Sequence, residues 1–259
     1  KNVRDEEKWP VALHKNHEII EKPTKQSLFT QRYTNEAINI IKENRKKENP
    51  FFIYLAHNMP HAPLFCSEKF KGKSEGGLYG DVIEEIDWSV GEIINVLKEE
   101  KIDKETLIIF MSDNGPWSMF KEFGGSTGPL RGEKGTGWEG GSRVPAIFYW
   151  PGKIKSDVSS DFMVNIDIYA TISSIIGGNL SSETDSIDMT DVLFERSMSS
   201  RENYLFFSGA RYNLPFSFRS GKYKIHFRTN ERSRDPINHK SIPAEEKINP
   251  LLYDLKNDI

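Results

Sequence analysis

The chain has 259 residues, of which 37% are hydrophobic and 28% charged, and its formal net charge is -3. This length and balance are typical of one large α/β domain, or of one domain with an appendage. A net negative charge does not favour a nucleic-acid partner, which selects for a basic surface. No apolar run approaches the roughly 20 residues of a membrane-spanning helix. A single cysteine, Cys66, excludes an internal disulfide and a cysteine-built zinc site.

The N-terminal part of the chain predicts a loop, a helix and a strand. Residues 1–26 are polar and contain prolines, so we expect little regular structure there. Apolar residues at helical spacing follow Ser27 and predict a helix that ends before Pro50. The apolar run Phe51–Ala56 then predicts a buried strand. A turn-forming segment with two histidines comes directly after that strand.

The next stretch predicts a helix and a second strand. Apolar residues repeat at steps of three and four from Val82 to Leu97, which indicates one long amphipathic helix. The run Leu107–Met111 predicts another buried strand. A strand, a helix and a strand at this spacing indicate a βαβ unit, in which the two strands are parallel. We therefore expect His61 and the pair Asp113-Asn114 to leave the sheet at the same edge.

The C-terminal part changes character. Val144–Trp150 predicts a further strand, and residues 165–176 predict a helix that Asn165 or Asp167 caps. Residues 179 to about 201 are predicted to link this helix to the C-terminal strands. Short strand-like runs there predict a small antiparallel sheet; they lie at 204–207, 215–219, 222–227 and 251–255. We expect two domains, residues 1–190 and 191–259.

Asp113 and Asn114 follow directly on a predicted strand. Carboxylate and amide oxygens suit Ca²⁺ or Mg²⁺ better than zinc. Two ligands do not complete a site that needs six or more oxygens, so others must come from elsewhere. The alternative is a simple turn after the strand, because Asn114-Gly115 is strong turn chemistry. On spacing alone the turn is favoured.

A loop with eight glycines runs from Gly124 to Gly141. Within it, Gly135–Gly140 satisfies G-x-G-x-x-G, but the segment neither follows a predicted strand nor opens a predicted helix, so we exclude a dinucleotide fingerprint. Arg131 and Lys134 lie among glycines that let the backbone approach a ligand. The alternative is a surface loop whose charges are solvated.

His61 lies between two prolines, which stiffen its backbone. A histidine at the carboxyl end of a strand can act as a general acid or an oxyanion partner, although a lone histidine is more often structural. We expect Cys66 to be structural as well, since nothing in its sequence context activates a thiol. A hard cation, a histidine and a lysine around one cavity would suit an anionic oxyester, because they stabilise charge on a leaving oxygen.

Four stretches together resemble the sulfatase family, in particular its arylsulfatase A and galactosamine-6-sulfatase branch. They are FFIYLAHNMPHAPL, SDNGPW, GPLRGEKGTGWEGGSRVP and LLYDLKND. The resemblance runs through most of the chain. It implies an α/β fold with an alkaline-phosphatase-like, mostly parallel sheet flanked by helices. It also implies a smaller C-terminal antiparallel-sheet subdomain.

The resemblance assigns roles to four residues. Asp113 and Asn114 are expected to be two ligands of an active-site Ca²⁺, with Mg²⁺ also possible. Lys134 is expected to contact the sulfate and the leaving oxygen, and His61 to hydrogen-bond the ester oxygen and assist its departure. The nucleophile of the family is a formylglycine hydrate, which is made from cysteine or serine in a C/S-x-P-x-R motif.

The chain also departs from the family pattern. It contains no C/S-x-P-x-R motif, and the paired acidic metal ligands of the family and the lysine and histidine that follow the nucleophile are absent too. We therefore expect the C-terminal part of a sulfatase, inactive by itself, with formylglycine in a part that this sequence does not include.

The expected substrate is a sulfated small molecule or carbohydrate, and we expect no nucleic-acid partner and no transmembrane segment. Family resemblance implies export to the periplasm, the outside or the lysosome. Two alternatives remain. One is a phosphonate or phosphate monoester hydrolase of the same superfamily, and the other is a non-catalytic, sulfatase-like binding protein.

Overall fold

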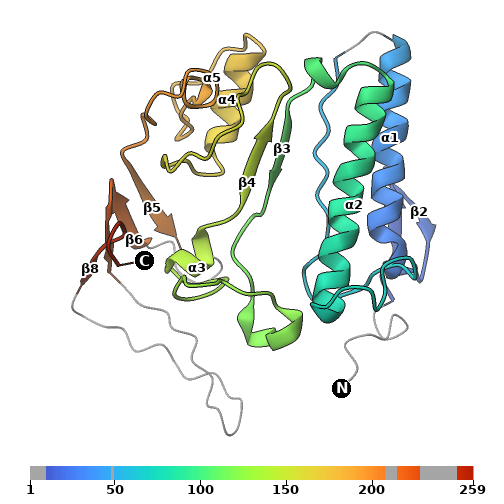
Figure 1. The fold of residues 1–259 in the computed structure, drawn as a ribbon, viewed down its shortest axis with the longest axis horizontal. Helices are drawn as coiled ribbons and strands as arrows, with labels where there is room; N and C mark the ends of the chain where they lie inside the picture. The colour runs from blue at the N-terminus through green and yellow to red at the C-terminus, as the bar shows by residue number, and fades with distance from the viewer. Residues whose placement is uncertain (1–9, 48–49, 208–214, 228–249, 259) are drawn as a thin grey trace, which may run out of the picture. The chain divides into compact units, whose positions relative to one another are not determined.

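A computed structural model describes residues 10–47, 50–207, 215–227 and 250–258. The chain divides into two compact units. Figure 1 colours the chain by residue number, from blue at the N-terminus to red at the C-terminus. Unit 1 comprises residues 1–106 and 117–125, and unit 2 comprises residues 107–116 and 126–259. In these described ranges, no helix is both long and apolar enough to cross a membrane. The predicted division into residues 1–190 and 191–259 stays a prediction.

Two long helices form the body of unit 1. They are α1 (Phe29–Lys47) and α2 (Gly77–Glu99), which lie side by side in Figure 1. A short 3₁₀ turn, η2 (Gln26–Leu28), leads into α1, and another, η3 (Asp103–Glu105), follows α2. Both helices confirm the predictions from apolar spacing, since each buries residues of the predicted stripe against the core.

The N-terminal segment is more regular than predicted. Strands β1 (Leu13–Lys15) and β2 (Glu18–Glu21) pair as an antiparallel hairpin in a stretch where we expected a loop. The connection is two residues long, and Asn16 adopts a left-handed φ of 55° there. Asparagine tolerates this conformation, so Asn16 could have indicated a hairpin turn in a segment that we judged only by its polar composition.

The predicted strand Phe51–Ala56 is not assigned as a strand, which corrects the βαβ prediction. The side chains of this segment alternate between half-buried and exposed, with Phe52 72% and Tyr54 84% exposed. A strand also requires a hydrogen-bonded neighbour, and none of the described residues supplies one. The prediction of a buried strand at Phe51–Ala56 is therefore wrong among the described residues.

Unit 2 begins with a two-stranded sheet. Strand β3 (Ile108–Met111) pairs antiparallel with β4 (Ala146–Tyr149), so that Ile108 lies opposite Tyr149. Both strands were predicted, but the parallel partner expected for β3 is wrong among the described residues. The glycine-rich loop between them ends in a short helix that was not predicted, α3 (Glu139–Ser142). No strand directly precedes Gly135, so the sequence G-x-G-x-x-G there still does not meet the requirements of a dinucleotide fingerprint.

Two further helices follow β4. Helix α4 (Asp167–Ile175) was predicted, whereas α5 (Thr190–Phe194) lies within the segment that we expected to be a linker. The predicted cap at Asn165 is wrong, because Ile166 is the N-cap residue and makes no side-chain cap hydrogen bond. The Asn165 amide instead donates to the carbonyl oxygen of Ser112 at 3.2 Å.

A four-stranded antiparallel sheet completes unit 2 and confirms the predicted C-terminal sheet. Its strands are β5 (Asn203–Phe207), β6 (Pro215–Ser220), β7 (Tyr223–His226) and β8 (Leu251–Asp254), in that order. On β7, Lys224 and His226 are buried while Tyr223 is 48% exposed, as the two-residue period of a strand requires. The sequence also contains His239 in a basic C-terminal segment, where a histidine could reach a substrate pocket but is more often a solvated loop side chain; it lies outside the described residues.

Candidate functional site

The predicted cation ligands lie on the turn that follows β3. Asp113 is exposed, so its carboxylate oxygens are open to solvent, and the Asn114 carbonyl accepts a hydrogen bond of 2.9 Å from the Ser112 hydroxyl. These hard oxygen donors fit Ca²⁺ or Mg²⁺ as part of a ligand set. The described residues contain no group of three or more His, Cys, Asp or Glu that could hold a metal ion. The turn thus offers two of the oxygen donors that a hard-cation site would need.

Backbone hydrogen bonds dock the Lys134 loop on this turn. The Lys134 N–H donates to the carbonyl oxygen of Pro116 at 2.9 Å, and the Gly115 N–H donates to that of Gly141 at 3.0 Å. Because both bonds are made by the main chain, they hold the loop in place without using the Lys134 side chain. The turn and the loop therefore form one hydrogen-bonded backbone assembly.

The glycines of this assembly allow two backbone segments to touch. A β-carbon added at Gly115 would overlap the carbonyl oxygen of Gly140. The Gly140 N–H in turn donates to the carbonyl oxygen of Arg131 at 2.8 Å, which closes the loop on itself. We expected the glycines to let backbone approach a ligand. At these positions they let backbone approach backbone, which is another use of a missing side chain.

An aromatic stack supports the loop from the C-terminal sheet. The Trp138 ring stacks on His226 with centroids 4.1 Å apart, and it meets the edge of Tyr253 at 5.4 Å. The Arg131 guanidinium lies 3.8 Å from the Trp138 ring centroid. Such contacts add cation–π attraction to apolar burial. Trp138 is therefore held from several sides, four residues after Lys134.

A buried ion pair supports the same loop. The Lys224 ammonium lies 2.8 Å from the Glu139 carboxylate, with side chains 0% and 7% exposed. Burial lowers the pKa of Lys224, and the Glu139 charge opposes that shift. Sequence reasoning missed this pair. The alternation Tyr-Lys-Ile-His in β7 puts Lys224 and His226 on one face, but it does not say which face is buried.

His61 belongs to unit 1 and is exposed. Its Nδ1 lies 2.7 Å from the carbonyl oxygen of Ala62, and its ring lies 5.9 Å from that of Trp117. Since a carbonyl oxygen only accepts hydrogen bonds, Nδ1 carries the hydrogen in this contact. In the neutral ring, the other nitrogen, Nε2, then carries no hydrogen.

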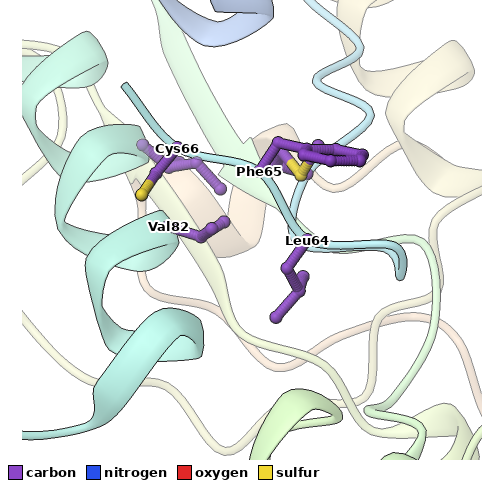
Figure 2. Packing of buried hydrophobic residues seen from close by; sticks show 6 residues of the cluster. Leu64, Phe65, Cys66 and Val82 are labelled. Atoms are coloured by element: carbon purple, nitrogen blue, oxygen red, sulfur yellow. The ribbon is translucent and has the colours of Figure 1, made fainter. Parts of the chain in front are cut away.

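An apolar cluster anchors the chain on both sides of His61. Figure 2 shows Leu64, Phe65 and Cys66 on the segment after His61, with Val82 reaching them from α2. Met59 and Ile86 complete the cluster. Burial raises the pKa of the Cys66 thiol to about 11, so the thiol is inert, as a structural cysteine should be.

Among the four predicted residues, the structure brings Asp113, Asn114 and Lys134 into one hydrogen-bonded assembly of unit 2, while His61 is anchored within unit 1. A match to the family described as Sulfatase covers residues 5–178. The chain belongs to the sulfatase family.

Curated relatives and solved structures agree with this family. Human arylsulfatase A is 33% identical over 257 residues, which are 96% of this chain and 51% of that protein. Human steryl-sulfatase is 40% identical over 202 residues, which are 75% of this chain and 34% of that protein. The solved PsFucS1 sulfatase from Pseudoalteromonas sp. has a TM-score of 0.79 at 31% identity, over 90% of this chain and 47% of that one.

These similarities confirm the alkaline-phosphatase-like α/β fold of the sulfatases. The chain spans about half the length of arylsulfatase A, 51% for the human protein.

Proposed function

We propose that this chain supplies part of the active site of an arylsulfatase-like sulfate ester hydrolase. The observation that carries the proposal is the docking of the Lys134 loop on the Asp113-Asn114 turn by main-chain hydrogen bonds, in a chain of the sulfatase family. This docking supports the proposal that Lys134 and a cation held by Asp113 and Asn114 act on the same substrate group. This arrangement suits a substrate whose ester group carries negative charge.

Asp113 and Asn114 would hold Ca²⁺, or Mg²⁺, through their side-chain oxygens. A cation bound there would neutralise charge on the sulfate oxygens and make sulfur easier to attack. Lys134 adds a positive charge that needs no proton transfer to act. Because its backbone is fixed before substrate binds, little reorganisation opposes its stabilisation of the transition state.

His61 is proposed to assist the leaving group. With Nδ1–H donated to the Ala62 carbonyl, only the imidazolium form also carries a hydrogen on Nε2. That Nε2–H can donate its proton to the ester oxygen as the sulfur–oxygen bond breaks, so that the product leaves as a neutral alcohol. The nucleophile lies outside this sequence, and we expect it to be the formylglycine of the family.

The substrate class is proposed from two relatives. The pig N-acetylgalactosamine-6-sulfatase is 37% identical over 210 residues. A solved structure with 28% identity and a TM-score of 0.79 comes from work on the metabolism of glycosaminoglycans by Bacteroides thetaiotaomicron. We therefore propose a sulfated carbohydrate or a small sulfate ester as substrate. Export to the periplasm, the outside or the lysosome remains an expectation.

The test is the substitution Lys134→Ala in the complete enzyme that contains this chain. Turnover of an aryl sulfate should fall by roughly 10²–10³-fold, because a charge that stabilises the transition state is lost. Lys155→Ala, which removes an exposed lysine elsewhere in unit 2, is the matched control and should keep normal rates. Near-normal turnover in Lys134→Ala, or a wild-type preference for phosphate over sulfate esters, would contradict the proposal.

The metal ligands have a test of their own in the same enzyme. Asp113→Ala should raise the Ca²⁺ concentration for half-maximal activity by more than about tenfold, since a carboxylate ligand is removed. Asp258→Ala, at an exposed carboxylate, is the control. An unchanged Ca²⁺ requirement in Asp113→Ala would remove this residue from the site.

A further inference from the structure

Helix α2 carries a column of buried polar side chains. Asp81, Glu85 and Ser89 are 2%, 1% and 0% exposed, and their spacing of four residues puts them on one face. The large majority of buried polar groups are hydrogen-bonded, so we expect each of these side chains to bind a neighbour. The neighbour that they hold is the segment of unit 1 that carries His61.

The first two members of the column anchor the loop after His61. The Asp81 carboxylate accepts three backbone N–H groups, from Gly72 at 2.8 Å, Lys73 at 3.0 Å and Ser74 at 2.9 Å. Burial alone would raise the pKa of Asp81, but these donors together hold it below its usual value. The Glu85 carboxylate accepts the Ser67 N–H at 3.0 Å.

Ser89 connects the column to His57. The Ser89 hydroxyl lies 2.6 Å from that of Thr34 on α1 and 3.3 Å from Nε2 of His57. Thr34 lies 2.6 Å from the carbonyl oxygen of Thr30. A carbonyl oxygen only accepts, so the Thr34 hydroxyl donates its single hydrogen to Thr30. In the contact between the two hydroxyls, the Ser89 hydroxyl must then be the donor and Thr34 the acceptor. The Ser89 oxygen is left to accept, and His57 therefore carries its hydrogen on Nε2.

The second nitrogen of His57 agrees with this tautomer. Nδ1 is buried and has no hydrogen-bond partner among the described residues. Burial lowers the pKa of His57, which favours the neutral ring. In the neutral ring with its hydrogen on Nε2, the buried Nδ1 is only an unpaired acceptor. In the other tautomer, Nδ1 would carry a buried N–H without an acceptor, which the Nε2–H tautomer avoids. The ring also lies 6.3 Å from that of Tyr33.

His57 and His61 are joined by a hydrogen-bonded turn. The His61 N–H donates to the carbonyl oxygen of Asn58 at 3.2 Å, and the His57 N–H donates to that of Leu55 at 3.2 Å. On its other side, His61 is followed by Leu64, Phe65 and Cys66 of the buried apolar cluster. The exposed His61 thus lies between two anchored segments. Before it, His57 is held by a hydrogen bond to Ser89, and after it the chain packs into the apolar cluster.

We propose that His57 is the positioning residue of His61, because the hydrogen bond from its Nε2–H to Ser89 fixes the turn that presents the His61 ring. The catalytic meaning of this role rests on the proposed function. The chain of hydrogen bonds Thr30–Thr34–Ser89–His57, which we call the relay, is independent of the proposed function.

The relay is tested by ¹⁵N-resolved NMR of the histidine rings in this 259-residue chain. His57 should show the Nε2–H tautomer and stay neutral at pH values where an exposed histidine is protonated. A dominant Nδ1–H tautomer would overturn the proposal, whether or not the enzyme is a sulfatase.

The positioning role is tested with two substitutions of similar size. His57→Gln places an amide donor where Nε2 was and should keep the Ser89 hydrogen bond, whereas His57→Asn reaches only as far as Nδ1 and should lose it. The His61 ring signals should therefore shift and broaden in His57→Asn and stay close to wild type in His57→Gln. Should His57→Asn fail to fold, Ser89→Ala removes the same hydrogen bond from the other side.

The complete enzyme adds a catalytic measurement. In His57→Asn, kcat for an aryl sulfate should fall by roughly 10- to 100-fold at a nearly unchanged KM, because a misplaced catalytic group costs about that much. His57→Gln should restore most of the rate. Equal effects of the two variants on His61 and on kcat would refute the positioning role. A wild-type enzyme without sulfatase activity would instead refute only the proposed function, since the NMR result stands independently.

Discussion

At the scale of single residues, His226 is a buried imidazole that the fold keeps neutral. It is 2% exposed and stacks on Trp138. Burial, assisted by the positive charge of Lys224, lowers its pKa from 6.5 to about 4. Its Nδ1 has no hydrogen-bond partner among the described residues, and the Glu139 charge opposes the lowering of the pKa without reversing it.

This neutral histidine should make stability depend on pH. As the pH falls from 6.5 towards about 4, His226 becomes protonated in the unfolded chain but stays neutral in the folded chain. The free energy of unfolding therefore decreases across that pH range. The loss should reach about 3 kcal/mol at most. His226→Phe keeps the ring stack and removes the titration. Thermal unfolding followed from pH 7 to pH 4 should therefore show a smaller loss for the variant, and parallel curves would contradict the prediction.

Residue-scale chemistry was only partly visible in the sequence. Asp113 and Lys134 could be singled out because each follows a recognisable local pattern, the end of a strand and a glycine-rich loop. Glu139 and Lys224 could not, because a charged side chain within a short segment is usually solvated. Only a tertiary contact between residues 85 positions apart pairs them.

At the scale of elements, the start of α4 is tied to the chain by a buried ion pair. The Asp167 carboxylate accepts hydrogen bonds from the Arg201 guanidinium, including one from Nε at 2.8 Å. It also accepts the N–H groups of Val164 at 2.9 Å and Ile187 at 3.0 Å. One carboxylate thus joins the helix start, the following segment and the residue that leads into β5.

Breaking this pair should be costly. Arg201→Met leaves the Asp167 carboxylate buried without its partner, so the free energy of unfolding should fall by about 3–5 kcal/mol. The matched control is Arg196→Met. It breaks the pair of Arg196 with Asp157, whose side chains are 49% and 57% exposed, and should cost less than about 1 kcal/mol. Urea unfolding of the two variants makes the comparison, and similar losses for both would disprove the special role of Arg201.

At the scale of the whole molecule, the chain holds four of the residues that the proposed reaction needs and lacks a nucleophile motif. Its sequence contains no C/S-x-P-x-R, and its only cysteine is buried with a raised pKa. This chain by itself should therefore not turn over an aryl sulfate. A steady-state assay of the purified 259-residue polypeptide, with and without added Ca²⁺, measures this directly. Turnover that disappears in Lys134→Ala would show that the prediction is wrong.

The sequence alone determined the local features of this protein. Apolar periodicity identified α1, α2, α4 and the strands β3 and β4, and turn and loop chemistry singled out Asp113, Asn114, Lys134 and His61. These features depend on neighbours within one element, which a sequence displays directly. Tertiary structure decided everything that requires a distant partner. It gave β3 an antiparallel neighbour and left Phe51–Ala56 without a strand partner among the described residues. It also buried Lys224 against Glu139 and brought His57 to Ser89. Hydrogen-bond pairing and burial arise between segments far apart in the chain, and no local pattern records which segments meet.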